Sequence, residues 1–544
     1  MFNKKSLRMI ASCLFIFILC LGIISCVQAA NTENGTNTSK DKKINTKITI
    51  GPKTPGGLKH AIKIAKTNDT IYLKKGTYTG TKNTGITITK NIKIIGIGSK
   101  VTINAQGKRR IFKITNCNVI LKKLKLTKGH SSNAGGAIYS EYSSLTVKNC
   151  IFTNNQAKKT GKNSETGSGG AIYYLNSYYL NKNGRLTVNN CIFTNNKAKW
   201  DGGTIACHGK ATIDNSTFKN NQAKLGGAIK GWHSTINQCT FTKNQGEDGG
   251  AIYDEEYSTI NNCTFKNNQA KENGGAIYSW RNLTINQCTF KNNQAKKNGG
   301  AIDCSDSTID QSTFKNNQAK KDGGAIYGWS TTIYQSTFQN NQAKRNGGAI
   351  YGGSSTFNQC TFKNNQAKKN GGAIGCWDSA INNCTFKNNQ AKKDGGAIYD
   401  YGYSTINNCT FKNNQAKRNG GAIYCFYDST INQCTFTKNQ AQKDGGAIYE
   451  YVNGTFEVTN CFFTTNQAKR NGGAIFSASN STIEKCTFEK NKADQKGGGI
   501  YNQVGLLQIT NSIFKNNIAA KNYNAIFSKG NVTQKNVTIS PKSY

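Results

Sequence analysis

Two short acidic clusters are the residues of this chain that come nearest to a carbohydrate-cleaving site. The chain of 544 residues contains 27 Asp and Glu against 71 Lys and Arg, so carboxylates are scarce. One cluster is Asp254-Glu255-Glu256, and the other pairs Asp303 with Asp306. Glycoside hydrolases use two carboxyl groups roughly 5–10 Å apart. Because neither cluster stands out from the residues around it, we predict no catalytic residue and keep a polysaccharide lyase or glycoside hydrolase as the alternative function.

Metal and phosphate chemistry have weaker support in the sequence. Cys207-His208 is a pair of possible zinc ligands, but two adjacent residues alone do not make a site. The four histidines are spread along the chain without ligand spacing. The recurring Gly-Gly-Ala-Ile motif lacks the Lys-Ser/Thr of a phosphate-binding loop. We therefore predict neither a metal nor a cofactor.

The cysteines repeat along the chain, and their pattern favours free thiols over disulfides. Eleven of the 19 occupy one position of a repeat, and Ser216, Ser312, Ser336 and Ser512 replace cysteine there. A cysteine that exchanges with serine behaves as a small buried residue. Equivalent Cβ atoms on stacked parallel strands also lie wider apart than a disulfide allows. The eleven are Cys150, Cys191, Cys239, Cys263, Cys288, Cys360, Cys384, Cys409, Cys434, Cys461 and Cys486.

The most variable stretch of the repeat, directly after Gly-Gly-Ala-Ile, is rich in aromatic and acidic residues. Variation on one face of a fixed scaffold is how solenoid proteins present binding surfaces. Rings about 10 Å apart, on alternate stacked coils, would suit successive sugars of an extended glycan, with carboxylates accepting hydroxyl hydrogen bonds. The alternative is that the rings pack as structural cover. The candidate ligand-binding residues are Trp232, Trp280, Trp329, Trp377, Tyr401, Phe426, Tyr451, Asp254, Asp378 and Asp428.

Lysine pairs recur at Gln-Ala-Lys-Lys and contribute to a formal net charge of +44. In stacked repeats, pairs such as Lys296-Lys297 and Lys320-Lys321 would form two basic columns along one edge. These columns would attract an anionic cell-wall polymer, an acidic glycan or extracellular nucleic acid in a salt-dependent way, and the sequence supports nucleic acid less than the other two. The alternative is that the lysines keep the protein soluble and protect its strand edges.

A repeat of 23 to 27 residues must position all of these side chains. Within one repeat, Cys263 and Phe265 share a face of an extended strand, and Asn262 with Asn267-Asn268 supplies turns and stacked side-chain ladders. Such a period without helical spacing predicts an all-β, right-handed parallel β-helix, a pectate-lyase-like solenoid. The expected core of one coil is Ala276, Ile285, Cys288, Phe290 and Ala295. The repeated alanine stands at Ala228, Ala251, Ala276, Ala301, Ala325, Ala349, Ala373, Ala397, Ala422, Ala447 and Ala474.

Gly-Gly-Ala-Ile together with Phe-x-x-Asn, as at Phe265 to Asn268, resembles the repeat of the polymorphic outer-membrane protein family. The Lys-, Asn- and Thr-rich coils behind a leader resemble the adhesin-like surface proteins of methanogenic archaea. The resemblance covers residues 46–528. It implies surface adhesion and names no ligand. Together with the aromatic and lysine columns, it leads us to expect a secreted or cell-surface, non-catalytic adhesin-like protein that binds glycans or wall polymers, on a host or a neighbouring cell.

The first residues have the pattern of a signal peptide: Lys4, Lys5 and Arg8, an apolar run, and Val27-Gln28-Ala29. The alternatives are an uncleaved anchor and a lipidated Cys26. No later stretch is apolar enough to cross a membrane.

The remaining boundaries follow from composition. A short capping helix is expected to start at an N-cap Thr54 with Pro55 next, burying Leu58, Ala61, Ile62 and Ala65. N-glycosylation is expected mainly at Asn34, Asn37, Asn531 and Asn536, outside the coils. The expected division is 1–29 signal peptide, 30–45 disordered linker, 46–130 N-terminal cap and first coils, 131–528 repeats and 529–544 C-terminal tail.

Overall fold

Each regular coil of the computed structural model contains four short strands. The coil that follows Gly274-Gly275-Ala276 consists of β30 (Ile277–Ser279), β31 (Thr284–Asn286), β32 (Thr289–Lys291) and β33 (Gln294–Ala295). We name the four stacked sheets by these members: sheet A contains β31, sheet B β32, sheet C β30 and sheet D β33. The structure describes residues 47–158, 166–176, 184–451, 454–520 and 525–540. The expected signal peptide and linker, with Asn34 and Asn37, lie outside these residues.

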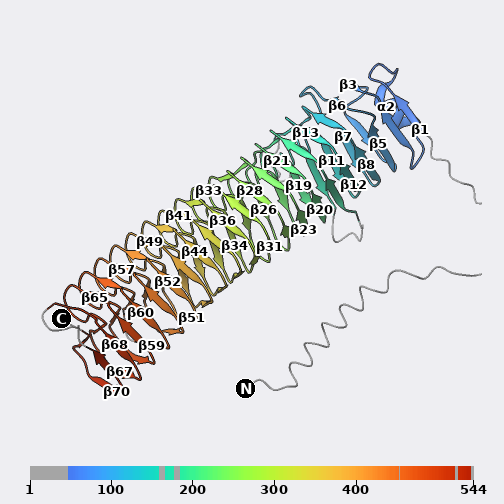
Figure 1. Cartoon of the computed structure of the whole chain (residues 1–544). Coiled ribbons are helices and arrows are strands. Elements are labelled where there is room, and N and C mark those ends of the chain that lie inside the picture. Colours follow the sequence, from blue (N-terminus) through green and yellow to red (C-terminus); the bar gives the residue numbers. More distant parts are fainter. Residues whose placement is uncertain (1–46, 159–165, 177–183, 452–453, 521–524, 541–544) are drawn as a thin grey trace, which may run out of the picture. The chain divides into compact units, whose positions relative to one another are not determined.

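Equivalent strands of neighbouring coils pair in parallel along the stack, and isolated bridges at Gln222 and Ile518 continue sheet D where it has no strand. Ile277 pairs with Ile302 in sheet C, and Phe290 pairs with Phe314 in sheet B. The coils therefore stack along one axis, as Figure 1 shows. The predicted right-handed parallel β-helix is confirmed.

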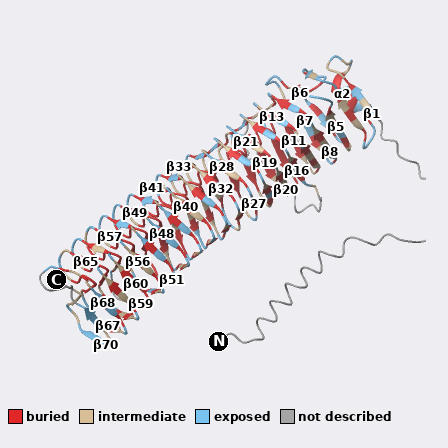
Figure 2. Ribbon diagram, in the orientation of Figure 1, coloured by how far each residue is buried: buried red, intermediate tan, exposed pale blue. Residues whose placement is uncertain are grey.

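The core is a column of the same few side chains in each coil. Ala276, Ile285, Cys288, Phe290 and Ala295, the set expected from the sequence, are all at most 3% exposed. The Phe265 and Phe290 rings stack with centroids 4.8 Å apart, and this ladder continues along the coils. Buried residues line the inside of the stack in Figure 2. Each coil buries little apolar surface alone, and stacking makes the core continuous.

The two asparagines after sheet B have different roles. Asn292 adopts a positive φ of 57°, which turns the chain out of β32. Asn293 points inward and is fully buried, donating to the Phe265 carbonyl and to Asn317 Oδ1, both at 3.0 Å. The expected asparagine ladder is therefore present, with the second asparagine of each pair as its buried member.

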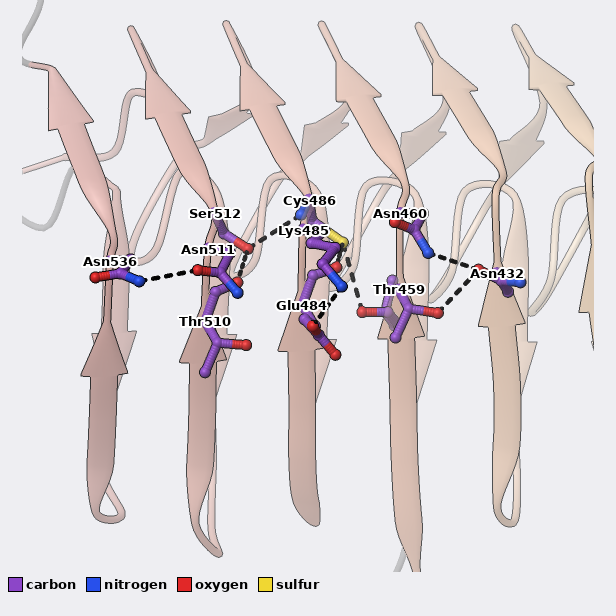
Figure 3. Close-up of polar contacts among 11 residues, drawn as sticks. Asn432, Thr459, Asn460, Glu484, Lys485, Cys486, Thr510, Asn511, Ser512 and Asn536 are labelled. Carbon is purple, nitrogen blue, oxygen red and sulfur yellow. Dashed lines mark hydrogen bonds and ion pairs between the residues drawn. The ribbon is translucent and has the colours of Figure 1, made fainter.

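The Cys/Ser column lies at the turn between sheets A and B (Figure 3). Cys486 Sγ contacts the Glu484 carbonyl at 3.2 Å, and Ser512 Oγ donates to the Thr510 carbonyl at 2.8 Å. Ser512 Oγ also accepts from the Cys486 backbone N–H at 3.0 Å. All cysteines in the described part of the chain are buried and free, as predicted. The position does more than fill space, because it satisfies backbone groups of the turn.

The N-terminal end carries the expected helix with a different start. Helix α2 (Gly57–Ile64) lies beside β1 (Lys47–Ile50), and its four expected apolar residues are buried. Thr54 is not the N-cap: its Oγ1 accepts from the Gly51 N–H, and Gly56 precedes the helix in a left-handed conformation. Across the described chain, no helix combines the length and apolar character of a membrane span.

Short parallel strands build the first coils behind helix α2. Strand β1 pairs with β2 and starts sheet A. The strands of this region are β2 (Thr70–Leu73), β3 (Gly76–Tyr78), β4 (Ile86–Ile88), β5 (Ile92–Gly96), β6 (Val101–Asn104), β7 (Phe112–Thr115), β8 (Asn118–Lys122) and β9 (Lys125–Thr127).

The stack continues into the segment expected to be a C-terminal tail. Strands β70 (Val532–Lys535) and β71 (Thr538–Ser540) pair with β67 (Leu507–Thr510) and β68 (Ile513–Lys515). Asn536 lies in the turn between them, and its Nδ2 donates to Asn511 Oδ1 at 3.1 Å (Figure 3). Asn531 directly precedes β70, and its carbonyl accepts from the Leu507 N–H at 2.9 Å. The expectation that Asn531 and Asn536 lie outside the coils is therefore wrong.

Candidate ligand-binding face

Sheet C presents two outward positions per coil. In β38 (Ile326–Trp329), Ile326 and Gly328 point inward, so strand alternation places Tyr327 and Trp329 on the outer face. The second position carries the predicted aromatic residues. We call Trp280, Trp329, Trp377, Tyr401, Phe426 and Tyr451 the aromatic edge.

The first outward position is a tyrosine column that the sequence argument missed. Tyr399 stacks on Tyr424 at 4.6 Å between centroids, and Tyr424 on Tyr449 at 5.1 Å. Tyr399 and Tyr424 are 7% and 6% exposed, and burial raises the pKa of both hydroxyls. The signal was present as the tyrosine that follows Gly-Gly-Ala-Ile in many repeats. These tyrosine rings therefore form a column on the outer face of sheet C, next to the aromatic edge.

The tryptophans are not evenly spaced at 10 Å. Trp329 and Trp377 come from alternate coils, yet their ring centroids are 5.2 Å apart. The reason is Gly353 between them, where a Cβ atom would lie 2.8 Å from Trp329 Cζ3. Tyr401 continues the stack at 4.9 Å from Trp377. Three rings therefore form one group instead of three separate platforms.

Trp280 and Trp232 lie apart from this stack. Trp280 is 61% exposed, and its Nε1 donates to the Tyr253 hydroxyl at 2.6 Å. Trp232 Nε1 donates to Glu256 Oε1 at 3.4 Å, and its ring meets His233 edge-on at 4.3 Å. Trp280 is thus the ring of the aromatic edge most open to a ligand.

The C-terminal part of the aromatic edge is a second aromatic group. Phe426 and Tyr451 have centroids 5.2 Å apart with tilted rings, and Phe426 meets Tyr427 edge-on at 4.9 Å. Tyr451 is 43% exposed. The structure therefore places all the predicted ring residues on one face, in separate small groups.

Asp254 does not lie on this face. It is fully buried inside the coil, where Ser258 Oγ and Ser279 Oγ donate to its carboxylate at 2.5 and 2.9 Å. Burial raises its pKa to about 6. The expectation failed because Asp254 is the third residue of β26 (Ile252–Asp254) and shares the inward face with Ile252.

Asp378 and Asp428 lie outside the core, and each uses an oxygen to hold the next turn. Asp378 Oδ1 accepts from the Tyr403 backbone N–H at 2.9 Å, and Asp428 Oδ1 accepts from the Thr455 N–H at 2.8 Å. Asp378 is exposed and Asp428 half-buried. The second carboxylate oxygen is the one through which each could accept a hydroxyl hydrogen bond.

The residues of the two acidic clusters point in different directions. Glu255 pairs with Lys230 at 3.0 Å and Glu256 with Arg281 at 2.9 Å, while Asp254 is internal. Asp303 stands outside sheet C between two coils of the tyrosine column, where burial raises its pKa to about 7. Asp306 is an exposed turn residue with a φ of 47°.

The possible zinc pair is also divided between two faces of a strand. Cys207 Sγ is buried and contacts the Gly209 carbonyl at 3.1 Å. The His208 ring lies 5.4 Å from that of Tyr173. Adjacent strand residues point to opposite faces, so these two groups do not meet.

Comparison with known families identifies the scaffold. A family model described as a right-handed beta helix region matches residues 178–343 and 326–470, which together exceed half of the chain. The chain belongs to the right-handed β-helix family. A second model, the Chlamydia polymorphic membrane protein repeat, matches residues 149–174 and 485–503 of this β-helix. The predicted resemblance to that repeat is confirmed at these places, and the resemblance to methanogen adhesins stays a prediction.

Solved structures similar to this β-helix include three carbohydrate-active proteins. The GH87 α-1,3-glucanase catalytic unit from Streptomyces thermodiastaticus has 14% identity and a TM-score of 0.35, covering 74% of this chain and 66% of the glucanase. A mutant of the PL6 family alginate lyase AlyGC has 9% identity and a TM-score of 0.33, with coverage of 90% and 100%. A mannuronic acid specific family 6 lyase from human gut microbiota has 11% identity, a TM-score of 0.24 and coverage of 85% and 86%. No match is found among curated proteins.

Proposed function

We propose that this chain is a secreted or cell-surface, non-catalytic, adhesin-like protein that binds an extended glycan along its aromatic edge. The stacked coils supply a scaffold with one side chain pattern repeated along its length. The matches to the polymorphic membrane protein repeat support a place at the cell surface.

The observation that supports glycan binding is the position of Trp280 and Trp329, which lie on either side of the coil that contains Ser305. Ser305 pairs with Trp329 in sheet C, and the two tryptophans are 61% and 39% exposed. Trp377 covers one face of Trp329, so the other face is turned toward the coil of Ser305. A sugar ring seated over this serine would contact an indole on each side, through the apolar C–H groups of its faces.

The test is the double variant Trp280→Ala, Trp329→Ala on an array of glucans, chito-oligosaccharides and polyuronates. Each tryptophan should contribute roughly tenfold in affinity, so binding of the preferred glycan should fall by about a hundredfold while the unfolding temperature stays constant. Tyr334→Ala is the matched control, because Tyr334 is also 39% exposed but lies on sheet A, in β39 (Thr332–Tyr334).

Two outcomes would contradict the proposal. Unchanged binding in the double variant would remove the aromatic edge as the site. Release of reducing ends or unsaturated sugars by the wild-type protein on the same polymers would support the alternative, a lyase or hydrolase, in place of a non-catalytic protein.

A further inference from the structure

A trough follows the corner between sheets B and D, away from the aromatic edge. One section of it has a volume of about 740 Å³ and a second about 590 Å³. Both are lined at the same repeat positions: the turn residue after sheet B and the outward glutamine of sheet D. The first section is lined by Asn220, Asn221, Gln222, Lys243, Gln245, Asn267, Gln269, Asn292, Gln294, Asn316 and Gln318. The second is lined by Asn388, Gln390, Asn413, Gln415, Lys438, Gln440, Thr465 and Gln467.

Amide groups give this trough a floor that suits hydroxyl groups. Each asparagine or glutamine side chain offers an acceptor oxygen and two N–H donors, and a sugar hydroxyl can both donate and accept. Some neighbouring amides already bond along the trough, as Asn316 Nδ2 does to Asn292 Oδ1 at 3.2 Å. The lining repeats with every coil, and coils are 4.8 Å apart as judged by the Phe265 and Phe290 rings. One sugar residue of an extended polymer is comparable in length to one coil.

A column of lysines borders each side of the trough. On the sheet B side the lysine precedes the lining asparagine, as Lys291 precedes Asn292; on the sheet D side it follows Gln-Ala, as Lys296 does. Among the described residues, none of the twelve lysines of these two columns that are given in the next sentence forms an ion pair. They are Lys266, Lys291, Lys315, Lys363, Lys387 and Lys412 beside sheet B, and Lys271, Lys296, Lys320, Lys344, Lys368 and Lys392 beside sheet D.

The second basic column expected from Gln-Ala-Lys-Lys has a different character. Its members Arg345, Arg418 and Arg470 pair with Asp322, Asp394 and Asp444 at 3.6, 3.6 and 2.9 Å. Lys297 of the same column pairs with Glu272. Carboxylates therefore pair with four members of this column, whereas the lysines given above beside sheets B and D form no ion pair among the described residues.

A third cavity, of about 610 Å³, adds an aromatic wall at the N-terminal end of this surface. Trp200 lines it together with several lysines and one carboxylate, including Lys199, Lys224, Lys271, Lys296 and Glu247. Lys224 Nζ lies 4.5 Å from the centre of the Trp200 ring and 3.9 Å from Glu247 Oε1, so Lys199, Lys271 and Lys296 remain without a carboxylate partner among the described residues. It shares Gln222, Gln245 and Gln269 with the first section of the trough, so the two are continuous. An indole beside several ammonium groups suits a sugar that carries a negative charge.

We propose that the trough and sheet D bind an extended acidic polysaccharide, with lysines pairing its carboxylate or sulfate groups and the amide floor bonding its hydroxyls. A nucleic acid would also be attracted by the charge. It would, however, use aromatic side chains along its path to stack its bases. The lining of the two trough sections is mostly amides, with Lys243, Lys438 and Thr465 and no aromatic residue, and Trp200 lines only the third cavity. This site is separate from the aromatic edge, and the proposal does not depend on the function proposed above.

The test compares the full chain with Lys296→Gln, Lys320→Gln, Lys344→Gln, Lys368→Gln in binding to polygalacturonate and heparin. The matched control carries the same loss of charge at exposed lysines of the first coils: Lys53→Gln, Lys66→Gln, Lys74→Gln, Lys93→Gln. The wild-type affinity should fall steeply with salt. In the trough variant the slope of log Kd against log salt should decrease by roughly 3, since each polymer charge in contact contributes about 0.7 for a single-stranded polyanion.

The control variant should keep nearly the wild-type slope, because the proposal depends on local charge and not on net charge. Equal losses in both variants, or no loss in the trough variant, would overturn it. So would tighter binding of single-stranded DNA than of polygalacturonate at the same salt concentration. The Trp280→Ala, Trp329→Ala variant should bind polygalacturonate as the wild type does.

Discussion

Buried polar side chains satisfy the backbone of each coil. Asn317 donates to the Phe290 carbonyl at 3.0 Å and to Asn341 Oδ1 at 3.1 Å, and its own oxygen accepts from the Asn293 N–H. Leaving such buried groups unpaired would cost about 1–3 kcal/mol each, which explains why this asparagine recurs so regularly.

Asp400 is a buried carboxylate whose ionisation should make stability depend on pH. It is fully buried, Ser404 Oγ donates to it at 2.7 Å, and burial raises its pKa to about 6. The unfolded chain ionises near 3.9, so between about pH 4 and 6 only the folded state holds the proton and stability falls as pH rises. In Asp400→Asn, the change in unfolding free energy across this pH range should be smaller than in the wild type by about 3 kcal/mol. The measurement is urea unfolding across that range.

Asparagine should be tolerated at this position, because Asn502 occupies the equivalent place in β66 (Ile500–Asn502). Asp378→Asn, which removes an exposed carboxylate, is the matched control. A wild-type pH profile in Asp400→Asn would show that this carboxylate is not the source of the dependence.

At the scale of the elements, periodicity predicted most of what the structure contains. The stacked strands, the buried column and the asparagine ladder follow from a strict repeat, because one coil determines the next. The sequence predicted less well which side chains point inward and which point outward. Asp254 is the first residue of a variable stretch, so we expected it on the surface, but strand alternation places its side chain inside the coil. The closure of Trp329 onto Trp377 depends on the empty space at Gly353, which spacing along the chain does not reveal.

Helix α2 should protect the first coil from association with other chains. Its Leu58 is fully buried against the core, and an uncovered sheet end offers unpaired backbone groups to other strands. Leu58→Ala should destabilise the packing of the helix by about 2–5 kcal/mol and promote concentration-dependent association. Light scattering over a dilution series measures this. Lys59→Ala changes the exposed neighbour and should leave the protein as it is; equal scattering by both variants would count against a protective helix.

At the scale of the whole molecule, a stack of equivalent coils should tolerate the loss of one complete coil. Removing residues 301–324 joins Gly300 to Ala325 and brings Phe290 onto Phe338, so every ladder meets an equivalent residue. Because each coil contacts only its neighbours, the shortened chain should fold with an unfolding temperature close to that of the wild type.

Removing residues 301–312 instead would bring sheet B segments to the place of sheet C and bury lysines. Far-ultraviolet circular dichroism should then show a folded protein for the first deletion and loss of β structure for the second. Equal behaviour of the two deletions would mean that register between coils does not control folding.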